Sequence, residues 1–209
     1  MENYWQLGRW ARIPVAMHWT VLIAFAWLYL LFMDLLSTLI GSAAFFALLV
    51  AHEFGHVAVL RRRKIAVESV TFYGIHGRTA HGYANTADEI LIAWGGVAAQ
   101  AVVLALALAG SYLLTPSLAP WVWIVAGPVL LVFTKLNVFL MIIALLPIGP
   151  FDGQSAWRAI PWIRGALRRR RKSANSAKAI KLTPEQRREL EESSEKAAAD
   201  LIEKLAKKK

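Results

Sequence analysis

The sequence predicts an all-α multi-pass membrane protein with about four transmembrane helices, a short membrane-associated β-hairpin and a cytoplasmic helical tail. Hydrophobic residues make up 57% of the 209 residues, and the mean hydropathy is positive. This apolar share exceeds that of an ordinary soluble domain. Polar segments separate four apolar blocks, each close to the ~20 residues that a membrane-spanning helix needs. The blocks cover residues 13–33, 35–60, 90–114 and 121–146.

The first block resembles a signal peptide, because Arg9 and Arg12 precede its apolar core. It is too long for the apolar region of a signal peptide, and it leads almost directly into the second block. We therefore expect a retained membrane anchor. A helix over the whole of residues 13–33 would form the first span.

The basic residues predict the orientation of the spans. Lys and Arg precede the first block, follow the second block at residues 61–64, and follow the fourth at residues 164–172. The connections around Asp34 and residues 115–120 carry no Lys or Arg. Cytoplasmic loops are enriched in Lys and Arg. With four spans, both termini are therefore expected in the cytoplasm.

Residues 65–83 predict the hairpin. β-Branched and aromatic residues alternate there with glycines, which is typical of short strands joined by turns. A simple interfacial loop is the alternative. His76 and His81 fall in this stretch and are expected at the surface or at the membrane interface, since five residues apart in a loop they are poorly placed to bind one metal ion.

The chain divides by composition into three parts. Residues 1–163 form the membrane-embedded domain, residues 164–182 a basic linker, and residues 183–209 a helical tail that begins with Thr183 as its cap and Pro184 in its first turn. The net charge is +10. Because the basic residues follow the topology, we expect the linker to contact anionic lipid, and nucleic-acid binding is the poorer explanation.

The second apolar block ends in His52-Glu53-Phe54-Gly55-His56, where charge is unexpected. Two histidines four residues apart on a helix differ by about 40° of rotation, so both imidazoles face the same side. This spacing suits zinc, and the intervening Glu53 can accept a proton from water that the metal activates. Ionisable residues inside a membrane are functional candidates by default. The alternative is a chance match on a helix.

A catalytic zinc needs a third protein ligand. The chain has no cysteine, so that ligand must be His, Asp or Glu. Asp152 is the best candidate, since it follows the fourth block at the cytoplasmic end of the membrane, where His56 and His52 are expected about 7 and 14 Å inside. An Asp in an ordinary turn beside Gly153 is the alternative.

These two motifs make the chain resemble the site-2 protease family of intramembrane zinc metalloproteases. The resemblance covers residues 14–153 and depends on His-Glu-Phe-Gly-His together with Asn137 and the Leu-Leu-Pro-x-x-Pro-x-Asp-Gly sequence that ends at Gly153. It implies that His52, His56 and Asp152 bind Zn2+ and that Glu53 is the general base. It also implies that Asn137 helps to hold an unwound substrate segment.

Two positions depart from the family pattern. Ala144 stands where a second Asn is usual before Leu-Leu-Pro, and Gly96 with Gln100 only approximates a Gly-Pro-x-x-Asn-like motif of the third span. Neither departure affects a metal ligand. Lys135 interrupts the fourth block, and it either extends to the headgroups or borders a water-filled cavity.

The sequence therefore predicts an enzyme of a prokaryotic cell membrane that cleaves a transmembrane or membrane-proximal segment of a protein substrate. One alternative is a catalytically silent homologue that binds a membrane client. The intact Glu53 argues against it, because a scaffold has no need of that base. A metal transporter is the other alternative, and the outer halves of the spans lack the polar relay that ions would require.

Overall fold

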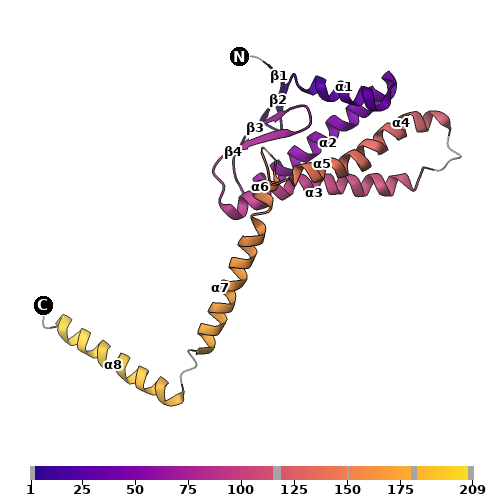
Figure 1. Cartoon of the computed structure of the whole chain (residues 1–209). Helices are drawn as coiled ribbons and strands as arrows, with labels where there is room; N and C mark the ends of the chain where they lie inside the picture. Colours follow the sequence, from indigo (N-terminus) through magenta and orange to yellow (C-terminus); the bar gives the residue numbers. More distant parts are fainter. Residues whose placement is uncertain (1–2, 115–118, 150, 180–182, 207–209) are drawn as a thin grey trace. The chain divides into compact units, whose positions relative to one another are not determined.

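The computed structural model describes residues 3–114, 119–149, 151–179 and 183–206. The chain forms two compact units, Met1–Ile160 and Pro161–Lys209. The first unit contains the membrane helices and a small sheet, and the second contains two polar helices (Figure 1). Pro150, a member of the proline-containing motif, lies outside the described residues.

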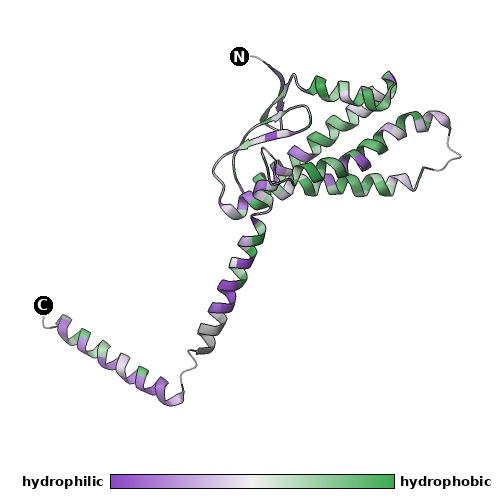
Figure 2. Cartoon of the chain, viewed as in Figure 1, coloured by the Kyte–Doolittle hydropathy of each residue, from purple (hydrophilic) through white to green (hydrophobic). Residues whose placement is uncertain are grey.

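Three long apolar helices dominate the first unit. They are α2 (Leu35–Arg62), α3 (Thr86–Ser111) and a bent third helix that comprises α4 (Pro120–Leu131), the π-helical η1 (Val132–Leu136) and α5 (Asn137–Ala144). Each is long and apolar enough to cross a membrane. The green ribbon in Figure 2 shows how continuous this apolar character is. Three of the predicted spans thus appear as helices.

The predicted helix over residues 13–33 was wrong in its first part. Ile13–His18 form strand β2, and only Val21–Phe32 form a helix, α1, whose 12 residues are fewer than a span needs. Ile13 and Val15 point into the core while their neighbours are less buried. An apolar run does not distinguish a strand from a helix by itself.

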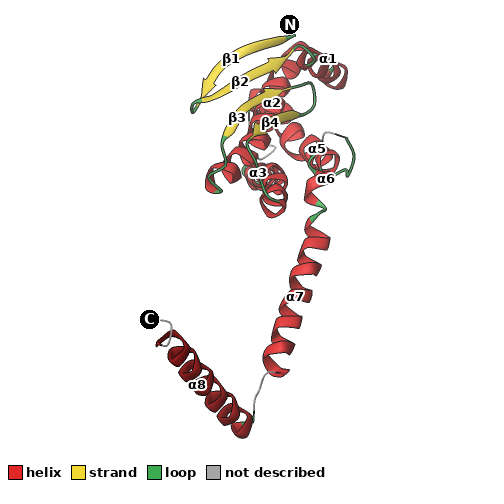
Figure 3. Cartoon of the chain, turned by 90° about the vertical axis from the view of Figure 1, so that its left-hand side faces the viewer, coloured by secondary structure: helices red, strands yellow, loops and turns green. Residues whose placement is uncertain are grey.

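The predicted hairpin is present, but it is half of a larger sheet. Strands β3 (Val67–Phe72) and β4 (Gly77–His81) form the hairpin, and β1 (Tyr4–Trp10) and β2 form another. The strand order is β1-β2-β3-β4, with β2 and β3 parallel (Figure 3). The crossover between β2 and β3 is the α1–α2 hairpin, as parallel strands require a long connection.

The sheet packs against α2 from the middle of the helix to its end. Phe72 of β3 meets Phe46 edge to face at 5.1 Å between ring centroids, and Trp10 of β1 stacks on Phe54 at 6.1 Å. Arg61 donates a hydrogen bond to the carbonyl of Ala11. These contacts place the sheet beside the part of α2 that contains both histidines.

Helices α2 and α3 begin where side chains cap them. Asp34 accepts a hydrogen bond from the Ser37 amide, and Asn85 accepts from two amides of the first turn of α3. Such caps satisfy amides that have no partner within the helix. Further along, Gly55 and Gly95 meet so closely that a methyl group on either would strike the backbone of the other helix. This approach brings α3 against the histidine face of α2.

The second unit consists of α7 (Ala159–Ala179) and α8 (Pro184–Ala206). Helix α8 starts as predicted, with Thr183 and Gln186 exchanging side chain to backbone hydrogen bonds in a capping box. The predicted basic linker is mostly helical, because its residues up to Ala179 belong to α7. Its residues 180–182 lie outside the described part of the chain.

Candidate metal centre

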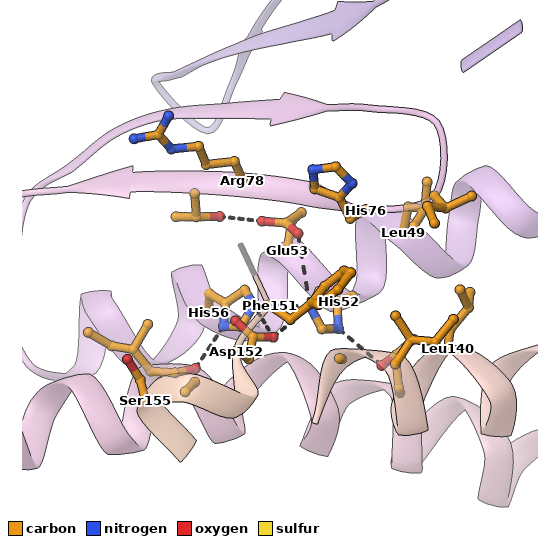
Figure 4. Close-up of a pocket in the computed structure, with 18 of the residues that line it drawn as sticks. Leu49, His52, Glu53, His56, His76, Arg78, Leu140, Phe151, Asp152 and Ser155 are labelled. Carbon is orange, nitrogen blue, oxygen red and sulfur yellow. Dashed lines mark hydrogen bonds and ion pairs between the residues drawn. The ribbon is translucent and has the colours of Figure 1, made fainter. Parts of the chain in front are cut away.

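The two histidines of α2 face the same point, as their spacing predicts. Their Nε2 atoms lie 3.1 Å apart, and both rings are at least partly buried. Helical geometry places residues i and i+4 one above the other, so no special backbone is needed. Figure 4 shows both imidazoles directed toward the segment that carries Asp152.

Asp152 reaches the same point from the segment that follows α5. Its Oδ2 lies 3.1 Å from Nε2 of His52 and 3.3 Å from Nε2 of His56. The short helix α6 (Gly153–Ala156) follows at once, and a methyl group on Gly153 would strike the carbonyl of Leu145. Glycine there lets the chain turn tightly over the end of α5 and directs Asp152 inward.

Hydrogen bonds fix which ring nitrogen of each histidine is free. Nδ1 of His52 lies 3.0 Å from Oε1 of Gln100, and Nδ1 of His56 lies 2.7 Å from the carbonyl of Ile92. Both partners are acceptors, so each Nδ1 carries the proton and each Nε2 presents a lone pair. Three lone-pair donors, two nitrogens and one carboxylate oxygen, then converge on one point.

This donor set fits zinc. A tetrahedral zinc site with bonds of ~2.0–2.1 Å separates its donors by roughly 3.3–3.4 Å, close to the separations of 3.1 to 3.3 Å between these atoms. Gly96 provides the room, because a methyl group there would lie 2.6 Å from Cε1 of His52 and Nε2 of His56. Without a cation, three lone pairs would face one another in a largely buried site.

Glu53 lies next to the donors but is turned away from them. Its Oε1 is 4.0 Å from Nε2 of His52, and its Oε2 accepts a hydrogen bond of 2.8 Å from Oγ1 of Thr79 on β4. The side chain is 2% exposed. Gly77 of the same strand leaves space for the carboxylate, which a methyl group would strike. Strand β4 therefore holds Glu53, a role for Thr79 that the sequence did not indicate.

A cavity of about 230 Å3 opens onto these residues. It is bounded by α2, α3, β4, α5 and the Asp152 segment (Figure 4). His76 and His81, both half-buried, also line it, which the sequence did not indicate. Burial holds the pKa of His76 below its usual value, although the charge of Glu53 acts in the opposite direction.

A second, apolar cavity of about 640 Å3 adjoins the first. It lies between α1, the β3–β4 turn and α5, and the two cavities share Ile75, His76, Leu140 and Ile143 as lining residues. Trp27 and Phe45 add to its apolar wall. The polar site thus lies next to a space suited to apolar side chains.

Asn137 is not among the described residues that line either cavity. It is fully buried between α5 and α3, and its Nδ2 donates hydrogen bonds to the carbonyls of Gln100 and Phe133. Contact between Asn137 and substrate stays a prediction. Lys135 is exposed on η1, and neither cavity includes it among the described lining residues.

Comparison with known proteins finds relatives of the chain in sequence and in fold. It is 33% identical over 191 residues to "Putative zinc metalloprotease Rip3" of Mycobacterium tuberculosis, in the strains Erdman and H37Rv, with 78% of this chain aligned. Its fold matches that of the site-2 protease from Methanocaldococcus jannaschii with a TM-score of 0.62 and 22% identity, over 75% of this chain and 71% of the other. The chain is thus related in sequence to zinc metalloproteases and shares the fold of the site-2 protease. No family model matches it.

The related proteins agree with zinc as the metal of this centre. A zinc metalloprotease homologue and the His52-Glu53-His56 cluster together support zinc as the cofactor. The three apolar helices identify a membrane protein. The chain spans 45%, less than half, of the length of the Rip3 proteins that it matches.

Proposed function

We propose that this chain is an intramembrane zinc endopeptidase that cleaves a transmembrane or membrane-proximal segment of a protein substrate. The observation that supports this most is the convergence of His52, His56 and Asp152 beside the buried carboxylate of Glu53. The convergence lies among helices long and apolar enough to cross a membrane. A purely structural metal site would have no need of a carboxylate held within 4.0 Å of a ligand.

Each residue then has a defined task. Zinc, when bound, supplies Lewis-acid polarisation of the scissile carbonyl. Glu53 accepts the proton of the attacking water and passes it to the amine that leaves. Thr79 keeps the carboxylate of Glu53 oriented through its hydrogen bond, while Gln100 and the Ile92 carbonyl hold the imidazoles.

The substrate must be extended at the scissile bond, because a helix buries its carbonyls in internal hydrogen bonds. Strand β4 is one of the two edge strands of the sheet and lies beside Glu53. An edge strand can pair with an extended peptide through backbone groups, independently of its sequence. We propose that substrate adds to β4 and places apolar side chains in the 640 Å3 cavity.

We also propose that both ends of the membrane domain face the cytoplasm. Pairing of β2 with β3 places the segment before α1 beside the segment that directly follows α2. Helix α3 then crosses outward and α4–α5 return, which agrees with the approach of Asp152 to both histidines. The basic residues 61–64 favour the cytoplasm for that side. Helix α1, with the sheet at its start, would complete the first crossing.

Comparing membrane proteomes of cells that carry wild-type protein and Glu53→Gln tests the activity. The variant keeps the shape of the side chain but removes the base, so client segments should accumulate uncut while zinc content stays unchanged. Glu68→Gln, on the exposed side of β3, is the matched control and should behave as wild type. Cleavage products unchanged in Glu53→Gln would favour the silent homologue that only binds a client.

A further inference from the structure

Helix α7 has an apolar stripe that becomes visible once its helical register is known. At 100° per residue, Ile160, Ile163 and Leu167 fall within an arc of about 60°. All three side chains are exposed, as is Trp162 in the same two turns. A stripe of this kind on an exposed helix needs something apolar to cover it.

Cations surround the same helix. Six of the nine residues 164–172 are Arg or Lys, and the five consecutive ones, residues 168–172, encircle the helix axis. No Asp or Glu occurs in the sequence between Asp152 and Glu185. The helix therefore has no carboxylate of its own to pair with these charges.

The start of α7 is fixed close to the end of α5. Nε1 of Trp157 donates a hydrogen bond of 2.7 Å to the carbonyl of Leu145, the residue that follows α5. Nε1 of Trp94 on α3 donates to the carbonyl of Ala156. Helix α7 begins at Ala159, two residues after Trp157.

We propose that α7 is an interfacial helix that lies along the surface of an anionic phospholipid bilayer. Its apolar stripe enters the boundary of the acyl chains, and the Arg and Lys side chains pair with phosphate groups of anionic lipids. A helix with an apolar stripe and a basic remainder has the composition of such in-plane helices. The covalent link to the membrane domain favours lipid over a soluble polyanion, because the bilayer is always within reach.

The absence of native cysteine makes a direct test possible. Single-cysteine variants Ile163→Cys, Leu167→Cys and, as a control on α8, Ser194→Cys would be labelled with an environment-sensitive fluorophore in the full chain. The proteins would be reconstituted into vesicles of phosphatidylcholine alone or with phosphatidylglycerol. We expect blue-shifted emission and at least twofold stronger quenching by brominated lipid at positions 163 and 167 than at 194, and only when phosphatidylglycerol is present.

Replacement of residues 168–172 by Gln removes five positive charges of α7 and keeps its apolar stripe, so it tests the contribution of charge alone. This variant should lose the phosphatidylglycerol-dependent shift at positions 163 and 167 while its zinc content stays that of wild type. Equal emission in both lipids, or a shift that persists in the Gln variant, would overturn the role of anionic lipid. Binding of added RNA in the presence of phosphatidylglycerol vesicles, with labels exposed to water, would assign the helix to nucleic acid instead. The experiment measures the depth of the fluorophore in the bilayer and does not measure proteolysis, so its outcome is independent of the proposed activity.

Discussion

Oε1 of Gln100 lies 3.0 Å from Nδ1 of His52, so a buried amide on α3 fixes the orientation of a candidate metal ligand on α2. The Gln100 side chain is 2% exposed and lines the metal cavity. Partners of this kind orient the imidazole and raise its basicity as a ligand. The position that only approximates the family's third-span motif thus has a definite task here.

Gln100→Leu should lower zinc affinity by about 10- to 100-fold, because the ring of His52 loses the acceptor that selects its tautomer. Competition with a chromogenic chelator measures this without any substrate. Gln100→Glu keeps an acceptor at the same reach and should retain most of the affinity. Equal affinities for wild type and the Leu variant would show that packing alone orients His52.

Gly96→Ala should displace the imidazoles, since its methyl group would lie 2.6 Å from atoms of both His52 and His56. Gly110→Ala is the matched control on the same helix, because nothing lies within 4 Å of its added methyl group. We expect zinc loss on dialysis in the first variant and not in the second. Full zinc retention in Gly96→Ala would contradict the close packing.

Thr79→Val removes the hydrogen bond to Oε2 of Glu53 while keeping the size of the side chain. A misdirected base should slow cleavage by roughly ten-fold, which corresponds to about 1.4 kcal/mol, with unchanged zinc content. Thr71→Val on the neighbouring strand serves as the control for loss of a threonine hydroxyl. Unchanged turnover in Thr79→Val would remove Thr79 from the catalytic arrangement.

Asn137→Ala should destabilise the membrane domain, because Nδ2 joins α5 to the Gln100 carbonyl of α3. Loss of a partner for a buried carbonyl costs about 1–3 kcal/mol, which should lower the melting temperature measured in detergent. If the role is structural, cleavage per folded, zinc-loaded molecule stays close to wild type. A normal melting temperature with greatly reduced cleavage would instead favour contact with substrate.

The topology can be checked with cysteines introduced into the cysteine-free chain. Leu35→Cys and Tyr112→Cys, at exposed positions on the predicted outer side, should react with an impermeant maleimide in intact cells. Arg62→Cys, at the end of α2, should react only after permeabilisation. Labelling in the reverse pattern would invert the orientation.

The residues of the candidate metal centre were easier to predict from the sequence than the sheet. Two of them lie four residues apart on one helix, and the third belongs to a second recognisable motif. The spacing of His52 and His56 follows from helix geometry alone. Asp152 needed a second motif at the same end of the membrane. Thr79 and Gln100 could not be found in this way, since each meets its partner only through tertiary packing between distant segments.

The strand Ile13–His18 was missed because its apolarity suits a helix and a buried strand equally. The segment is a strand because it pairs with β1 and β3. Strand β1 is adjacent in the sequence, but β3 lies more than 50 residues later in the chain. No periodicity within the block itself carries that information. The same holds for α7, whose stripe becomes visible only when residues 160–167 are known to be helical.

Parallel pairing of β2 with β3 imposes an order on how the molecule assembles during synthesis. Strand β2 leaves the ribosome before α1 and α2, and it must wait until β3 is made before its second edge is paired. Until then that edge is open to wrong partners, as unpaired strands are. The third metal donor, Asp152, is made later still. Formation of the α1–α2 hairpin therefore comes before closure of the sheet, and completion of the candidate metal site comes last.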